Sequence, residues 1–302
     1  MNPLRQSTKH LWLALTTLLF AAAAPAQSSP VYVAYNGSDS NACTRPAPCQ
    51  TITHALSVVA AGGVVDIVAS GTYDTFTITH AVSVEADPGV DAIINVAANG
   101  TGITISAGSS DTVALQNLSV QGAASGVGMQ ANSAAKILVA NCQSSSVAYG
   151  ISLDSTSTDF EITGGDFQGS DTSIIIRAAS NEVSIDGVKT QGAGSNAAID
   201  AVGTHITVTH STLLGNGANP GIWVKGGSTV VLENDVVTGF AEGVVVGAGL
   251  SGNGTAFLSN NTISANSTGV DVAVGTAFTR GNNTIRQNTT NVGGSLTAIS
   301  GQ

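Results

Sequence analysis

The chain has 302 residues, of which only 9% are charged, against about 25% in an average globular domain. Glycine occurs 36 times, proline 7 times, and acidic residues outnumber Lys and Arg by 19 to 9. This composition excludes a collagen helix, which needs glycine at every third residue, and a coiled coil, which needs many more charged residues. The acidic balance argues against nucleic acid and anionic membranes as partners, and it is compatible with divalent cations such as Ca²⁺.

The first 26 residues are expected to be a cleaved signal peptide. Basic residues at 5 and 9 precede an apolar stretch over 11–24, and Ala24-Pro25-Ala26 has the small residues of a cleavage site. The stretch is too short to span a bilayer comfortably, and no later one approaches the roughly 18 apolar residues of a membrane helix. We therefore expect a secreted or periplasmic protein that is not inserted in a membrane, with cleavage near Ala26.

Residues 27–63 are expected to form an N-terminal cap. Cys43 and Cys49 flank a proline-rich loop, and such a close pair in an exported protein predicts a disulfide. No metal site is predicted there, because His54 alone is a poor additional ligand. Apolar residues recur with helical spacing over 52–59, and Gly62 and Gly63 would end this short helix.

From about residue 100 onward a short phrase recurs: a small residue, an aliphatic residue, any residue, and another aliphatic one. Its copies begin at intervals of 22 to 26 residues, at Gly102, Gly126, Gly150, Ser173, Ala198, Gly221, Gly243 and Gly269. A near-constant period of this length indicates a solenoid, in which each repeat is one structural unit. Alternate residues after each small residue are expected to point inward and outward, as in a β-strand.

A second phrase recurs with the same period as the first. It is a five-residue segment with alternating apolar positions, and its last residue is always Asn, Gly or His: Asn117, Asn141, Gly164, Gly187, His210, Asn234, Asn260 and Asn282. These residue types best tolerate the left-handed backbone region. We therefore expect the same turn at this place in every repeat, with a further short strand after it. Cys142, just after one such turn, is expected to be a small buried hydrophobe.

These patterns predict an all-β fold, a single-stranded parallel β-helix of about ten coils of about 24 residues over 64–294, with a short tail at 295–302. The coils would stack at roughly 4.8 Å, the strand spacing of a sheet. A leucine-rich repeat would show helical return segments, and a propeller blade would need about 40 residues. A β-sandwich would not keep a near-constant repeat length through so many copies.

The repeats and the segment before them resemble the right-handed parallel β-helix superfamily, which has the pectin-lyase-like fold. In that segment Pro48-Cys49-Gln50-Thr51-Ile52 leads to Gly62-Gly63 and then to Gly71-Thr72-Tyr73. In similar secreted proteins it is a short capping helix followed by the first strands. The resemblance covers about residues 31–290 and implies the fold. It implies no single activity, because the superfamily includes lyases, hydrolases, esterases, epimerases, tailspikes and adhesins.

The motifs that mark pectate lyases and polygalacturonase-like enzymes of this superfamily do not occur in the chain. The Arg-x-Pro-x-x-Arg segment of pectate lyases would need arginines around Pro220, the single proline after residue 100, and there are none. The Asn-Thr-Asp, Asp-Asp and Gly-His-Gly segments of polygalacturonase-like enzymes are missing as well. We therefore predict no catalytic constellation, no metal site and no cofactor.

Residues at the same phase of successive coils are expected to lie beside one another. Two and four positions after the small residues, this rule gathers five side chains over four coils: Asp154, Arg177, Asp200, Trp223 and Lys225. An indole that stacks on a sugar ring and charges that grip uronate or hydroxyl groups would make a carbohydrate-binding patch. A simpler interpretation, which we favour, is an Asp154–Arg177 surface ion pair worth about 0–1 kcal/mol, with Trp223 packed beneath a loop.

Three functions are compatible with these observations. The first is interaction of an exported β-helix with carbohydrate or the cell surface, without clear catalysis. The second is a lyase or hydrolase that acts on acidic polysaccharide through atypical residues. The third is a structural or adhesive solenoid. A polysaccharide is the expected partner in the first two, and turnover of acidic polysaccharide would distinguish the second.

Overall fold

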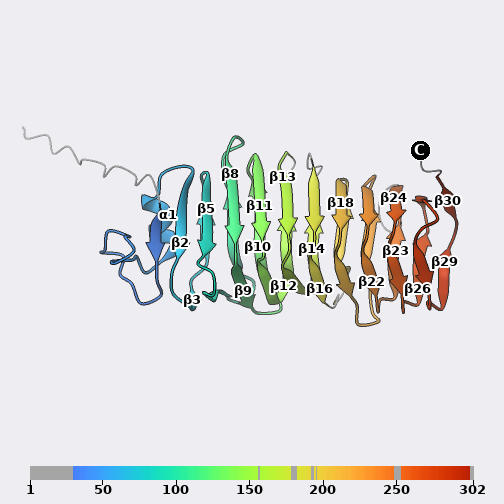
Figure 1. Cartoon of the computed structure of the whole chain (residues 1–302), viewed down its shortest axis with the longest axis horizontal. Helices are drawn as coiled ribbons and strands as arrows, with labels where there is room; N and C mark the ends of the chain where they lie inside the picture. Colours follow the sequence, from blue (N-terminus) through green and yellow to red (C-terminus); the bar gives the residue numbers. More distant parts are fainter. Residues whose placement is uncertain are drawn as a thin grey trace, which may run out of the picture.

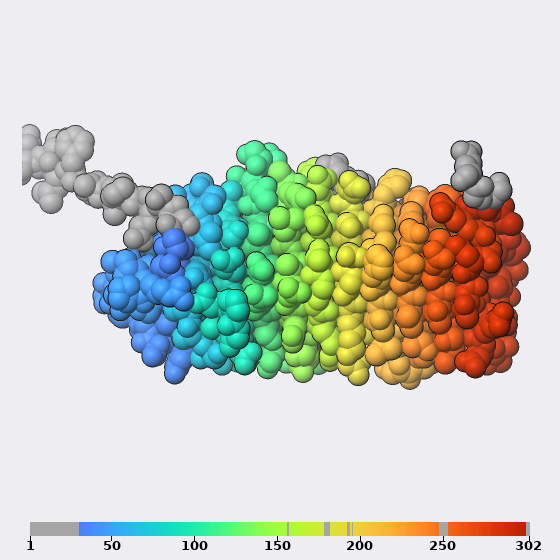
Figure 2. All heavy atoms as spheres, viewed as in Figure 1, coloured from blue at the N-terminus to red at the C-terminus, as the bar shows by residue number. Residues whose placement is uncertain are grey.

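The computed structural model describes residues 30–155, 157–177, 182–191, 194, 196–247 and 253–299. Within these residues the chain winds into a rod of stacked coils, with its first and last coils at opposite ends (Figure 1). Figure 2 shows the same elongated shape with side chains in place. Strands pair in parallel with those of the coils before and after, which confirms the predicted all-β parallel β-helix of about ten coils. The predicted signal peptide lies outside the described residues.

Each coil contributes short strands to three walls, which we call A, B and C in chain order. Wall A is a 12-stranded sheet among the described residues. Its strands are β1 (Val31–Val33), β2 (Gly63–Ile67), β5 (Val82–Ala86), β8 (Thr112–Gln116), β11 (Lys136–Ala140), β13 (Asp159–Thr163), β15 (Val183–Asp186), β18 (His205–Thr209), β21 (Thr229–Glu233), β24 (Gly254–Ser259), β27 (Gly275–Thr279) and β30 (Leu296–Ala298).

Walls B and C form one 18-stranded sheet in the described chain, because two long strands, β12 (Gln143–Leu153) and β14 (Asp166–Ile176), run through both. Wall B also contains β3 (Gly71–Tyr73), β6 (Ala92–Val96), β9 (Leu118–Gly122), β16 (Lys189–Gln191), β19 (Thr212–Leu214), β22 (Val236–Thr238), β25 (Thr262–Ser264) and β28 (Thr284–Arg286). Wall C also contains β4 (Phe76–Ile78), β7 (Thr101–Ser106), β10 (Val127–Ser133), β17 (Ile199–Val202), β20 (Ile222–Lys225), β23 (Glu242–Val246), β26 (Thr268–Val272) and β29 (Thr290–Gly293).

The turn from wall A to wall B places one residue in the left-handed region in coil after coil. The backbone φ angle is positive at Asn117, Asn141, Gly164, Gly187, His210, Asn234, Asn260 and Gly281. The predicted column is therefore confirmed as far as Asn260. The prediction of Asn282 in the last coil is wrong, because Phe278 pairs with Phe257 and brings Gly281 beside Asn260. Glycine takes this conformation without the steric cost of a Cβ atom.

The small residues at the beginning of the wall C segments also stack in one column. Its members are Gly102, Gly128, Gly150, Ser173, Ala198, Gly221, Gly243 and Gly269. A Cβ atom on Gly150 would come within 2.5 Å of the carbonyl oxygen of Ser173 in the next coil, so the backbones approach closely here. The prediction of Gly126 is wrong by two residues, because Met129 rather than Val127 enters the core and pairs with its neighbours.

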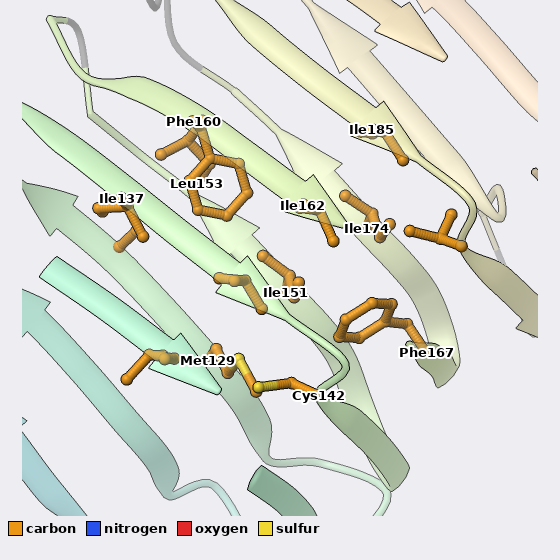
Figure 3. Packing of buried hydrophobic residues seen from close by; sticks show 14 of the residues in the cluster. Met129, Ile137, Cys142, Ile151, Leu153, Phe160, Ile162, Phe167, Ile174 and Ile185 are labelled. Carbon is orange, nitrogen blue, oxygen red and sulfur yellow. The ribbon is translucent and has the colours of Figure 1, made fainter. Parts of the chain in front are cut away.

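The interior of the rod is filled by alternate side chains of the three walls. Figure 3 shows Met129, Cys142, Ile151, Phe167 and Ile174 from successive coils packed between the walls, and each is at most 2% exposed. Burying a large apolar side chain contributes roughly 1.5–3 kcal/mol, so these repeating inner columns stabilise the stack. Burial also raises the pKa of the Cys142 thiol to about 12, which makes this residue an inert part of the core.

A short helix covers the first coil at the N-terminal end of the rod. Thr51 caps the N-terminus of helix α1 (Ile52–Val58), and its side-chain oxygen accepts a hydrogen bond from the His54 amide at 3.1 Å. The helix contacts β1, β2 and β4 with its apolar face. Cys43 and Cys49 form the predicted disulfide, which closes the preceding loop. The cap shields the apolar interior at this end.

Candidate functional site

The five candidate residues lie on the outer face of wall C. Buried isoleucine, alanine and valine side chains alternate with Asp200, Trp223 and Lys225 along β17 and β20, so these three point away from the core. Asp154 and Arg177 directly follow β12 and β14, two strands that pair with each other. We call these five residues the wall C strip.

The first half of the wall C strip is centred on Arg177. Its Nη1 atom lies 3.3 Å from Oδ1 of Asp154 and 3.5 Å from Oγ of Ser152, whose hydroxyl donates to Oδ2 of Asp154 at 2.9 Å. The guanidinium carbon lies 5.2 Å from the centroid of the Tyr149 ring, within cation–π range. The Arg177 side chain is still 42% exposed, so it is held in place and accessible to an anion.

Tyr149 is neutral in this arrangement. A hydrogen bond with Asp171 raises the pKa of the Tyr149 hydroxyl, and burial raises it further, while the charge of Arg177 opposes both effects. A phenol whose pKa lies above its ordinary value of about 10 keeps its proton at neutral pH. Tyr149 therefore supplies a flat ring and a hydroxyl, not a strong base.

The second half is a buried ion pair beneath an aromatic ring. The Lys225 ammonium lies 3.0 Å from each carboxylate oxygen of Asp200 and 3.4 Å from Oδ1 of Asn196. Asn196 in turn donates to Oδ2 of Asp200 at 2.8 Å. The Nζ atom also lies 3.5 Å from the ring centroid of Trp223. The side chain of Asp200 is 3% exposed and that of Lys225 is 19% exposed, so these charges mainly hold Trp223 in place.

The two halves are neighbours on the sheet but form separate groups. Ile175 pairs with Asp200 and Val202 pairs with Lys225, so apolar side chains lie between the halves. The strip extends over four coils, roughly 14 Å at the strand spacing of a sheet. The structure therefore brings Asp154 to Arg177, and Asp200 to Trp223 and Lys225, but it does not join all five in one cluster.

Two contributing side chains were not predicted from the sequence. Tyr149 directly precedes the small residue Gly150, and Asn196 lies two residues before Ala198. Both lie where the chain passes from wall B into wall C, Tyr149 within the long strand β12 and Asn196 ahead of β17. Inspection of the residues that precede each small residue would have singled them out.

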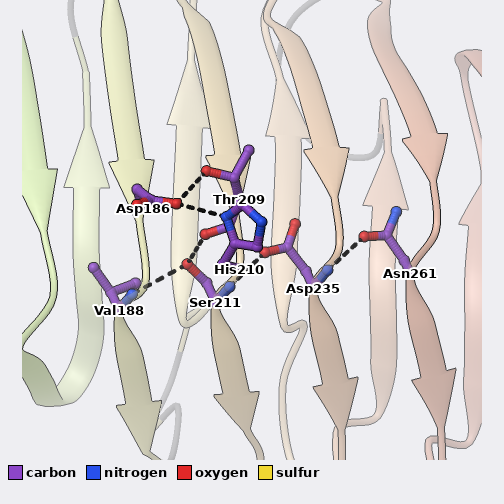
Figure 4. Close-up of polar contacts among 7 residues, drawn as sticks. All are labelled: Asp186, Val188, Thr209, His210, Ser211, Asp235 and Asn261. Atoms are coloured by element: carbon purple, nitrogen blue, oxygen red, sulfur yellow. Dashed lines mark hydrogen bonds and ion pairs between the residues drawn. The ribbon is translucent and has the colours of Figure 1, made fainter.

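Asp235 has an unusual pKa, which burial raises to about 7, and such groups are often functional. Its contacts instead give it a place in a buried ladder (Figure 4). The Ser211 amide donates to Oδ1 of Asp235 at 2.8 Å, and the Asp235 amide donates to Oδ1 of Asn261 at 2.9 Å. Nδ2 of Asn261 also donates to the Leu232 carbonyl at 2.9 Å. Oδ2 of Asp235 takes the corresponding place without a partner among the described residues.

A second group with a shifted pKa lies on the first coils of wall A. Burial raises the pKa of Asp66 to about 6, and the like charges of Asp87 and Glu85 add to this, while Arg45 lowers it. Arg45, on the loop closed by the disulfide, forms ion pairs with Asp87 and Asp66. These contacts attach the loop to the first coils, so their function is structural.

Neither a metal centre nor a deep cleft accompanies the wall C strip in the described part of the chain. The described side chains that come within 4.8 Å of one another as a three-ligand set are Cys43, Cys49 and His54, and the disulfide occupies both sulfurs. Hollows of about 300 and 310 Å³ open on wall A, around Phe257 and Glu161. None of the described residues belongs to a helix with the length and apolar character needed to cross a membrane.

Comparison with known sequences places most of the chain in one family. The sequence profile described as "Protein of unknown function (DUF1565)" matches residues 35–298. No curated protein matches the chain in sequence.

Several solved structures have the same fold. An alginate lyase from Paenibacillus sp. str. FPU-7 is 15% identical, with a TM-score of 0.56 over 89% of this chain and 98% of that one. Pectate lyase Pel9A is 13% identical, with a TM-score of 0.58 over 92% and 80%. A GH136 lacto-N-biosidase from Eubacterium ramulus is 8% identical, with a TM-score of 0.52 over 90% and 67%. At these identities the likeness establishes the right-handed parallel β-helix and not the activity.

Proposed function

The chain belongs to the DUF1565 family, and from this premise we propose that it is an exported carbohydrate-binding protein that holds an acidic polysaccharide along the wall C strip. The observation that carries the proposal is the state of Arg177. Its guanidinium is fixed between Asp154 and the Tyr149 ring, and yet it is 42% exposed on an open face. A fixed and accessible guanidinium suits a sugar carboxylate, which it can bind through two parallel hydrogen bonds.

Trp223 supports this assignment. It lies in the coil after Asp200, with which it pairs, and its indole is partly exposed. The ammonium of Lys225 is 3.5 Å from the ring centroid, so the ring is ordered before any ligand arrives. An ordered aromatic side chain binds with a smaller entropy cost than a mobile one. Arg177 and Trp223 are two coils apart, roughly 9.6 Å along the rod, and would thus contact different sugar units of one chain.

The solved structures with this fold include an alginate lyase, a pectate lyase and a lacto-N-biosidase. A carbohydrate-related function in general therefore fits the fold. The disulfide fits an oxidising compartment outside the cytoplasm, which supports the proposed export.

Binding is favoured over catalysis by the state of the titratable groups. A general base must lose its proton near the working pH and have its lone pair available. Lys225 is engaged by Asp200 and Asn196, and the pKa of Tyr149 is raised. A polysaccharide lyase or hydrolase is the second candidate, and it is distinguished by turnover alone.

The test is calorimetric titration of the protein with oligomers of galacturonate and of mannuronate. Arg177→Gln is expected to weaken binding about 10- to 100-fold, since a charged hydrogen-bond pair is lost, and Trp223→Ala is expected to weaken it about 10-fold. Lys136→Gln, which removes an exposed charge on wall A, is the matched control and should bind normally. Release of unsaturated or reducing ends, with or without Ca²⁺, would favour the enzyme. Absence of both binding and turnover would reject the proposal in favour of a structural solenoid.

A further inference from the structure

A second surface with the character of a ligand site lies at the C-terminal end of wall A. A hollow of about 300 Å³ opens there between β21, β24 and β27. Val231 and Phe257 line one side, and Glu233, Ser259 and Arg280 line the other. None of these residues belongs to wall C, so this hollow is separate from the wall C strip.

The apolar side of the hollow is a flat and supported surface. Val231 pairs with Phe257 in the next coil, and Phe257 pairs with Phe278 in the one after. The two phenyl rings are stacked, with centroids 4.9 Å apart and planes inclined by 15°. Ile299 also lines the hollow, and its amide donates to the Thr279 carbonyl at 2.9 Å. Stacking on Phe278 fixes the orientation of Phe257, which suits the apolar C–H face of a sugar ring.

The polar side carries two opposite charges that do not neutralise each other. Glu233 pairs with Ser259, and Arg280 occupies the next coil, since its amide donates to the carbonyl of Leu258. Glu233 and Arg280 are thus two coils apart, roughly 9.6 Å at the strand spacing of a sheet. Ser259, which is 9% exposed, lies between them.

Arg280 differs from most basic residues of this acidic protein. Arg45, Lys136, Arg177, Lys189 and Lys225 all form ion pairs. In the part of the chain that the structure describes, Arg280 and Arg286 have no such partner. Of these two, only Arg280 lines the hollow. A guanidinium with no carboxylate partner among the described residues, in a chain with 19 acidic residues, is available for an anion from outside.

We propose that this hollow binds one acidic sugar unit, a hexuronate, with its C–H face on Phe257 and its carboxylate on Arg280. Glu233 and Ser259 would accept or donate hydrogen bonds to the ring hydroxyls. The negative charge of Glu233 disfavours a doubly charged phosphate and tolerates a singly charged, hydroxyl-rich ligand. This second site does not depend on the wall C strip and would let one molecule hold two chains or two parts of one chain.

The experiment is calorimetric titration with digalacturonate, and with neutral galactobiose as the uncharged counterpart. It is carried out in the Arg177→Gln background, so that heat comes mainly from the hollow. Adding Arg280→Gln is expected to weaken digalacturonate binding about 10- to 100-fold. Adding Arg286→Gln, a matched loss of charge on β28 outside the hollow, should change nothing.

Fluorescence and the binding results together separate this site from the wall C strip. Trp223 lies in the wall C strip, so its fluorescence reports binding there and not in the hollow. The fluorescence change on adding digalacturonate should therefore persist in the Arg280→Gln protein. If the strip binds nothing while Arg280-dependent binding persists, the proposed function fails and the second site stands. Equal binding of digalacturonate and galactobiose, unchanged binding in the Arg280→Gln protein, or no binding in the Arg177→Gln background would each overturn the second site. Thermal unfolding of each variant confirms that it is folded.

Discussion

The carboxylate of Asp200 is 3% exposed although it projects from the outer face of a sheet, and both of its oxygens lie 3.0 Å from the ammonium of Lys225. An ionised carboxylate at this depth is tolerable only while its partner is present, because an isolated buried charge is costly. The pair therefore has a different energetic role from the exposed ion pairs elsewhere on the rod.

Lys225→Met is expected to lower the free energy of unfolding by about 3–5 kcal/mol, since it leaves the Asp200 carboxylate buried without a cation. Urea denaturation of the parent and the variant measures this difference. Lys189→Met is the control, because Lys189 pairs with Asp166 in an exposed position and its loss should cost at most about 1 kcal/mol. Equal effects of the two substitutions would contradict the assignment.

Asp235→Asn is expected to stabilise the protein at neutral and higher pH. The pKa of Asp235 is raised from 3.8 to about 7 in the folded protein, so the folded state binds more protons than the unfolded state between these values. The contribution of the protonated Asp235 carboxyl to the free energy of unfolding is therefore fully present below about pH 4 and is lost as pH rises through about 7. An asparagine can donate from the position of Oδ2 as Asn261 does, and it carries no charge.

The expected gain for Asp235→Asn is about 2–4 kcal/mol at pH 8 and much less at pH 4. Denaturation curves at both pH values measure it. Asn261→Asp places a carboxyl in the next rung of the same ladder and should have the opposite effect. A gain that does not vary with pH would mean that the charge of Asp235 is not the cause.

Gly150→Ala is expected to destabilise the fold by about 1–3 kcal/mol through overpacking. A Cβ atom there would lie 2.5 Å from the Ser173 carbonyl oxygen and 2.6 Å from Oγ of Ser144. Ser173→Ala, in the same column, is the comparison. The Ser173 hydroxyl is buried and has no hydrogen-bond partner among the described residues, so its removal should be neutral or stabilising. Thermal unfolding measures both effects: the Tm of Gly150→Ala should lie below that of the parent, and the Tm of Ser173→Ala should equal or exceed it.

Arg45→Gln is expected to raise the pKa of Asp66 further above its present value of about 6. Burial and Asp87 already raise that pKa, and Arg45 is the cation that opposes them. Asp87→Asn should lower it, because a like charge is removed. Carboxyl carbon shifts followed by NMR titration report the Asp66 pKa directly. No change in either variant would show that the three side chains do not interact in solution.

The fold was predictable because two sequence phrases repeat in phase, and each marks a physical necessity. Small residues occur where coils approach closely, and Asn or Gly occurs where φ is positive. The two misplacements arose where neighbouring residues fit the phrase equally well. Gly126 and Gly128 both precede an aliphatic side chain, and Gly281 and Asn282 both tolerate the turn. Pairing with adjacent coils, which no single repeat reveals, decides between them.

Within the candidate site, the sequence could predict only the contacts between residues at the same phase of successive coils. Equal phase brought Asp154 to Arg177, and Trp223 to Asp200. Contacts that involve residues outside the strands, such as those of Asn196, depend on loop paths that the periodicity does not specify. The same rule places Val231 beside Phe257 in the hollow on wall A. It does not place Phe278 there, because Phe278 joins this column only through the pairing that shifts the last coil by one residue.

In a rod of stacked coils, the distance along the axis between two residues of equal phase is a whole number of strand spacings. Each added coil moves everything beyond it by one strand spacing, roughly 4.8 Å, and leaves the interior cross-section unchanged. Arg177 and Asp200 lie in adjacent coils. Insertion of one coil between them would therefore increase the separation of the two halves of the wall C strip by one increment and leave each half intact. If the wall C strip binds a polysaccharide as proposed, a relative with one more coil there would bind a longer stretch of that ligand through the same residues.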